Sequence, residues 1–272
     1  MDVLAGALAC GVIIAGTGGM LAHPTDDDGN GKRTRMRTLK DATQLGQVHK
    51  AMVVFAHDND EAMPRPGLID RHPTDVGGRK MNVPGRGEED LAANTTANLY
   101  SMLITMRYFT PELVVSPVER NPKVAADKDF NYDAYNPAED TYWDDAFTAN
   151  LSDGSNASYA HLVMSGERMH MHWKNTLDAQ FIVLGNRGPA AGEPDGRSHT
   201  CGPHGTWAGN VMFADNHSEF ISTFTPASLK PRHGSTQPDN IFAMEAGPRG
   251  DDCILSFTRG FDDEDKPLLQ HD

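Results

Sequence analysis

The chain has 272 residues, which is enough for one sizeable hydrophobic core. Its 24 Lys and Arg stand against 38 Asp and Glu, and the resulting net charge of -14 argues against nucleic acid as a partner. The 26 glycines and 17 prolines indicate short elements joined by many loops. Three cysteines exclude a disulfide framework and a four-cysteine zinc site, and leave open whether Cys201 and Cys253 pair or remain buried free thiols.

The first elements in chain order are an apolar run and a break. Val3 to Ala22 carry no charge and are long enough, as a helix, to cross about 30 Å of hydrocarbon. A cleaved signal peptide fits less well because Asp2, and no basic residue, precedes the run. We therefore predict a transmembrane helix over 1–22, followed by a hinge over 23–31 that contains Pro24, Gly29 and Gly31.

A basic amphipathic stem helix is predicted over 32–62. Its apolar side chains recur with helical spacing, and Lys40, Gln44, Gln47 and Lys50 fall on the opposite side. The residues expected to pack on the rest of the protein are Leu39, Leu45, Gly46, Met52 and Val53. His49 falls on the same face and is interpreted as a core histidine.

Residues 63–272 are predicted to form an α+β head. A second helix is expected over Asn94 to Phe109, and a short strand over Leu113 to Val115. Longer strand-like runs then follow at His161–Met164, Phe181–Leu184, Gly209–Ala214, His217–Ser222 and Cys253–Phe257. The last of the acidic stretches, around Asp262 to Asp265, is interpreted as a solvated tail.

A hairpin is the strongest local prediction in the head. The stretch Asn210 to Ile221 places two strand-prone runs on either side of Asp215-Asn216. This pair tolerates the positive φ that a tight hairpin turn requires.

Three stretches, taken in order, resemble one family. Arg37 to Met52, followed by Phe55-Ala56-His57-Asp58-Asn59-Asp60 and Pro64, is similar to the second half of a pilin-type helix. Tyr108 to Pro117 is similar to the helix-to-strand step that follows in these proteins. His204 with Gly209 to Phe220 resembles their C-terminal H-x9-DG hairpin, over 204–221 here. The family is that of the bacterial prepilin-like, or type II secretion pseudopilin-like, proteins.

The chain also departs from the family pattern. It opens at Met1-Asp2-Val3-Leu4 without the basic leader, and ten residues separate His204 from Asp215. Asn216 stands where the family has glycine, and Ser116 where it often has cysteine. These departures put processing by prepilin peptidase and polymerisation in doubt, whereas the family-motif positions His204, Asp215, Asn216 and His217 remain recognisable.

The resemblance implies a fold and a function. The expected fold is pilin-like: a long N-terminal helix, with a membrane half and an amphipathic half, packed on a small antiparallel sheet with long loops. The expected function is that of a membrane-anchored structural subunit of a type II secretion or type IV pilus-like assembly, without catalysis and without a cofactor or metal. Its partners would be other pilin-like subunits, secretion-system components and the lipid bilayer. Its location would be the cell envelope, as a single-pass membrane protein with a periplasmic or extracellular head.

The alternative is a secreted metal-binding protein or metal-dependent hydrolase. His170 and His172 alternate, so on a strand both would point to one face and could ligate zinc or copper with the histidines of 199–217. No third ligand can be assigned from the sequence, and an exposed histidine pair is the favoured interpretation of the pattern. A third reading, a ligand-binding module, would use the aromatic residues of 130–147.

Overall fold

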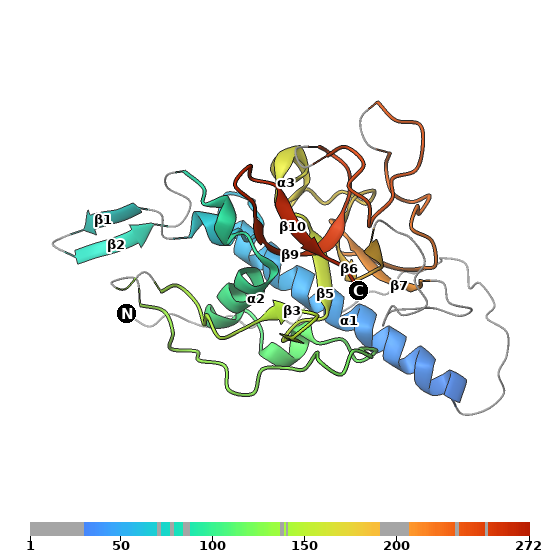
Figure 1. The fold of residues 1–272 in the computed structure, drawn as a ribbon, viewed down its shortest axis with the longest axis horizontal. Coiled ribbons are helices and arrows are strands. Elements are labelled where there is room, and N and C mark those ends of the chain that lie inside the picture. Colours follow the sequence, from blue (N-terminus) through green and yellow to red (C-terminus); the bar gives the residue numbers. More distant parts are fainter. Residues whose placement is uncertain are drawn as a thin grey trace.

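The computed structural model describes residues 30–69, 72–76, 79–83, 88–136, 139, 141–190, 207–231, 234–247 and 250–272. Its largest element is a six-stranded antiparallel sheet with the strand order β10-β9-β5-β6-β7-β8 (Figure 1). The strands are β5 (Tyr159–Leu162), β6 (Ile182–Asn186), β7 (Gly209–Phe213), β8 (Ser218–Ile221), β9 (Leu255–Phe261) and β10 (Pro267–Gln270). Each of the five strand-like runs predicted between His161 and Phe257 overlaps one of these strands.

Two smaller sheets and three α-helices complete the described part of the chain. β1 (His72–Val76) pairs with β2 (Arg79–Val83), and β3 (Ala149–Asn150) pairs with β4 (Gly154–Ser155). The α-helices are α1 (Asn30–His57), α2 (Thr96–Thr105) and α3 (Gly166–His172). Short 3-10 helices lie at Pro66–Leu68, Leu91–Ala93 and Pro111–Val114.

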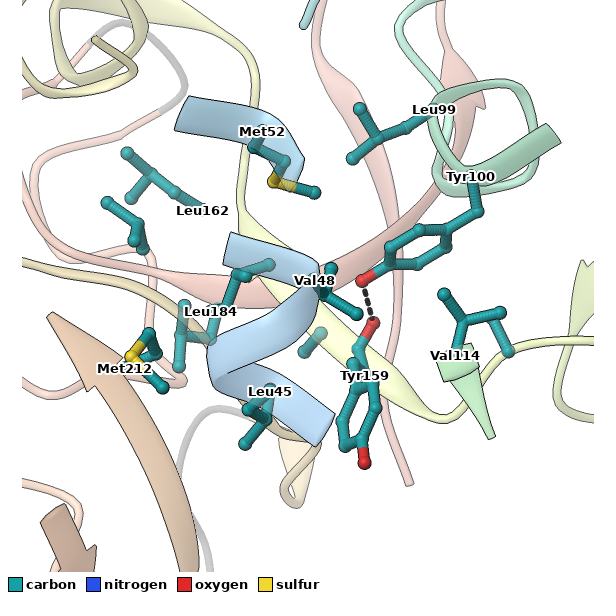
Figure 2. Close-up of a cluster of buried hydrophobic side chains, with 14 of the residues drawn as sticks. Leu45, Val48, Met52, Leu99, Tyr100, Val114, Tyr159, Leu162, Leu184 and Met212 are labelled. Atoms are coloured by element: carbon teal, nitrogen blue, oxygen red, sulfur yellow. Dashed lines mark hydrogen bonds between the residues drawn. The ribbon is translucent and has the colours of Figure 1, made fainter. Parts of the chain in front are cut away.

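The hydrophobic core lies where α1 and α2 meet the sheet (Figure 2). Leu45, Val48 and Met52 of α1 project toward the strands at helical spacing and are fully buried. Leu99 and Tyr100 of α2 close one side of this core, and the hydroxyl of Tyr100 donates to the carbonyl of Tyr159 at 2.8 Å. Strands β6 and β7 are buried along their whole length, as expected for the centre of a sheet.

The predicted pilin-like fold is wrong. The described residues form a mixed α and β structure built on a six-stranded sheet, and they contain no long N-terminal helix that joins an apolar half to an amphipathic half. The helix that is present, α1, begins at Asn30, so Asn30 and Gly31 of the predicted hinge are helical, and it ends at His57. The family resemblance rested on short segments, and these identified the helix and the hairpin. They could not predict the size of the sheet, because it depends on strand pairing between residues far apart in sequence, such as His161 with Ser256.

The membrane prediction also requires correction. Among the described residues, no helix combines the length and the apolar character needed to span a bilayer. Helix α1 has the length, but its first eleven residues include Lys32, Arg33, Arg35, Arg37 and Lys40. This finding contradicts the predicted single-pass membrane protein of the cell envelope. The apolar run itself, and the predicted transmembrane helix over 1–22, lie outside the described residues.

Two local predictions fail for identifiable reasons. Leu113 to Val115 were predicted as a strand, but Pro111 begins a 3-10 helix that includes Leu113 and Val114. The acidic stretch Asp262 to Asp265 is not a free tail, because it forms the turn between β9 and β10. There Asp262 accepts hydrogen bonds from the backbone of Glu264 and Lys266, which lower the pKa of its exposed carboxyl.

Candidate functional site

The predicted hairpin of residues 210–221 is present at the edge of the sheet. β7 and β8 pair in register from Gly209 with Ile221 to Met212 with Ser218. Asn216 adopts the left-handed conformation, with φ +69°, at the turn between them. Beside it, His217 bonds to Asp215 and stacks on Phe213 with ring centroids 4.2 Å apart. His204, the first residue of the family motif, lies outside the described residues.

His49 connects this hairpin to α1. It is fully buried, and its Nδ1 lies 3.0 Å from Oδ1 of Asn216. Burial lowers the pKa of His49, with Asn216 and Asp215 opposing the shift, so the ring is held in its neutral form near neutral pH. Its Nε2 has no hydrogen-bond partner in the described part of the chain. His49, predicted as a core histidine, thus positions the turn through Nδ1, whereas Nε2 makes no hydrogen bond to the described residues.

The predicted packing face of α1 is divided by the structure. Leu45 and Met52 are fully buried, and Gly46 and Val53 are partly buried. Gly46 lies close to the sheet, because a methyl group on it would come within 3.5 Å of Cε of Met212. Leu39 is 68% exposed and therefore lies off this face.

A buried carboxylate at Asp41 was missed by the sequence analysis. Asp41 has no exposed surface, and it bonds to Ser116 Oγ, to Tyr159 Oη at 3.0 Å and to Asn210 Nδ2 at 2.6 Å. Burial raises the pKa of Asp41, and these donors partly counteract the increase. A signal was available, since Asp41 lies four residues before Leu45 on the buried stripe of the helix. All three donors are neutral side chains. Because two of them, Tyr159 and Asn210, belong to strands of the sheet, these bonds fix α1 on the sheet.

The first described turns of α1 are the basic part of the predicted stem helix. They project beyond the body of the protein (Figure 1). Arg35, Arg37 and Lys40 are exposed, and among the described residues none is paired with an acidic side chain. The neighbouring apolar side chains of Met36 and Leu39 are 71% and 68% exposed. The helix is tied to the sheet at Thr38, where Asn210 Nδ2 donates to the Thr38 carbonyl at 3.0 Å.

The histidine pair of the metal hypothesis does not form a binding face. His170 and His172 lie on α3 rather than on a strand, and residues two apart on a helix point in different directions. His172 stacks on Phe181 at a centroid distance of 3.5 Å. Within the described ranges, no group of three His, Cys, Asp or Glu side chains could hold a metal ion. His199 and Cys201 lie outside them, and the buried thiol of Cys253 donates to the Ile182 carbonyl.

The aromatic residues of 130–147 pack on one another. Phe130 makes edge contacts with Tyr132 and Phe147, at centroid distances of 5.0 and 6.0 Å. Phe130, Phe147 and Trp143 are buried, whereas Tyr135 is 47% exposed. The segment is therefore a packed loop with tyrosines at its surface.

Comparison with known proteins gives no assignment. No family model, no curated protein and no solved structure matches this chain. The resemblance to prepilin-like proteins thus remains a prediction that rests on the stretch Arg37 to Pro64 and on the hairpin over 204–221.

Proposed function

We propose that this protein is a non-enzymatic structural subunit that assembles with further copies of itself through the start of α1. The observation that carries the proposal is the exposure of that segment. Asn30 to Lys40 contain five basic and no acidic residues, in a chain whose net charge is -14. A charged segment of this kind is attracted to the acidic surface of a second copy.

Exposed apolar side chains support the same function. Met36 and Leu39 lie three residues apart, so they share one side of the helix. Both are long aliphatic side chains that lie between basic residues. A helix face with apolar contacts and a charged rim is the usual composition of a protein interface. The expectation from the prepilin-like resemblance, association through the N-terminal helix, agrees with this use of α1.

The rest of the described structure is consistent with a scaffold. Buried polar groups, such as Asp41 and the ion pair of Arg168 with Asp252, hold elements of the fold together. His49, the buried histidine closest to the hairpin motif, contacts the turn rather than a polar cluster open to substrate. These arrangements support a structural role over a catalytic one.

Charge reversal on α1 tests the proposal. The full chain carrying Arg35→Glu, Arg37→Glu and Lys40→Glu is compared with wild type by light scattering coupled to size exclusion at low salt. We expect wild type to show a mass above that of the monomer and the variant to remain monomeric. The matched control is Lys50→Glu, Lys230→Glu and Arg259→Glu, which changes the charge equally at three exposed sites elsewhere. Wild-type association in the α1 variant, or equal loss in the control, would contradict the proposal.

A further inference from the structure

The segment 127–145 is the most acidic part of the molecule and is rich in aromatic residues. It contains seven Asp or Glu and one Lys, together with Phe130, Tyr132, Tyr135, Tyr142 and Trp143. Asp129, Asp133, Glu139 and Asp145 are exposed. We call this segment the acidic loop.

The acidic loop already binds one arginine of its own chain. The guanidinium of Arg107 lies 5.3 Å from the centroid of the Tyr132 ring and 3.8 Å from the carboxylate of Asp133. Arginine over a tyrosine face and beside a carboxylate combines a cation–π contact with an ion pair. The loop therefore offers the chemistry that a second arginine-bearing segment would need.

The start of α1 and the acidic loop lie on opposite sides of the molecule in Figure 1. In Figure 1 the acidic loop, in yellow-green, is at the left, and the first turns of α1 extend to the lower right. The view places the longest axis of the protein horizontally, so one copy cannot bring these two segments together. A contact between them requires a second copy.

We infer that the basic start of α1 docks on the acidic loop of a neighbouring copy, which makes the assembly head-to-tail. This inference rests on the proposed function and names the surface that receives the helix. Arg35, Arg37 and Lys40 face Asp129, Glu139 and Asp145 across the contact, while Met36 and Leu39 lie against tyrosine rings such as Tyr135. Such an interface uses two different surfaces, so each copy keeps one of each available, and the contact repeats along a chain or closes a ring.

Three full-length variants test the receiving surface by sedimentation velocity at low salt. The loop variant carries Asp129→Lys, Glu139→Lys and Asp145→Lys. The control carries Glu88→Lys, Glu167→Lys and Asp263→Lys, which are equal reversals at exposed positions elsewhere. The third is the α1 variant described above. We expect the loop variant to associate at least about tenfold more weakly than wild type, from three lost ion pairs, and the control to stay near wild type.

Mixing the loop variant with the α1 variant adds a sharper test. Each variant is expected to self-associate more weakly than wild type, but the acidic helix of one matches the basic loop of the other, and the two unaltered surfaces also match. We expect the mixture to recover association. The neutral variant carries Asp129→Asn, Glu139→Gln and Asp145→Asn, which preserve side-chain size better than lysine does. We expect it to associate more weakly than wild type and more strongly than the loop variant.

The outcomes separate the two proposals. Loss of association in the α1 variant with wild-type association in the loop variant would overturn the docking surface and leave the proposed function standing. Wild-type association in both variants would overturn both. Equal weakening by the control, or no recovery in the mixture, would also contradict the acidic loop as the receiving surface.

Discussion

Asp41 joins three parts of the protein through one buried carboxylate. It is on α1, while its partners Ser116, Tyr159 and Asn210 come from the segment after α2 and from strands β5 and β7. A buried charge with several neutral donors is stable only while those donors remain in place. The position of α1 on the sheet therefore depends on this residue as well as on apolar packing.

We predict that Asp41→Ala lowers the free energy of unfolding by about 2–4 kcal/mol, because three buried donors lose their acceptor. Asp41→Asn keeps one acceptor oxygen and should cost less. Urea unfolding followed by circular dichroism measures both values. Lys40→Ala, one residue away and exposed, serves as the control and should change stability by less than about 0.5 kcal/mol. A cost for Asp41→Ala as small as this would contradict the assigned role.

Asp239 is a buried carboxyl that the fold keeps protonated into the neutral range. Its exposed fraction is 2%, and Oδ2 accepts a hydrogen bond from the backbone of Cys253 at 2.6 Å. Burial, then repulsion from Asp252 and Glu245, raise the pKa of Asp239 to about 7. Oδ1 has no hydrogen-bond partner among the described residues, which leaves no donor there to stabilise a charged carboxylate.

We predict that Asp239 makes stability pH-dependent. Because its folded pKa of about 7 lies above the unfolded value of 3.8, its contribution to stability is complete below the unfolded pKa. That contribution is lost as the pH rises through the folded pKa. Asp239→Asn mimics the protonated form, so the stability of wild type relative to this variant should fall between pH 5 and pH 8. Urea midpoints at the two pH values measure the effect, and an unchanged difference would refute it.

At the scale of elements, the β7–β8 hairpin shows what local sequence can determine. Asp215-Asn216 predicted the turn because asparagine tolerates a positive φ, and the structure has φ +69° at Asn216. The contact of its side chain with His49 could not be predicted, since 167 positions of sequence separation lie between the two residues. Asp41 is a similar case: its place on the buried stripe was visible, but its partners were not.

Asn216 has two separable roles, which substitutions distinguish. Asn216→Ala should destabilise the protein by about 1–3 kcal/mol, because it combines left-handed backbone strain with loss of the bond to His49. Asn216→Gly removes the strain and loses only the bond, so it should be less destabilising by about 1 kcal/mol. Thermal or urea unfolding of the two variants gives the difference. Equal costs would show that the turn is not strained by a side chain at this position.

The predicted fold failed because its evidence was local. Periodicity identified α1 and α2, and β-prone runs identified five strands, since these patterns reflect burial within one element. The pairing of β5 with β9, such as that of His161 with Ser256, depends on residues far apart in sequence, which no short motif reports. The membrane prediction rested on the hydropathy of Val3 to Ala22. The helix that the structure describes, α1, begins at Asn30, after that run, and its first turns are basic.

At the scale of the whole molecule, charge is distributed unevenly between two ends. The first turns of α1 are basic, and the acidic loop lies on the other side of the molecule along its longest axis (Figure 1). Each segment alone would be an ordinary solvated surface. Together they give the protein complementary ends, which is why self-assembly is the function that we favour.

Sedimentation velocity of the wild-type full chain over a range of concentrations tests this claim most directly. At low ionic strength we predict species larger than the monomer whose proportion grows with concentration. Raising the salt to about 1 M, where the Debye length is about 3 Å, should shift the distribution toward monomer. A single monomeric species at every concentration and in low salt would contradict the account.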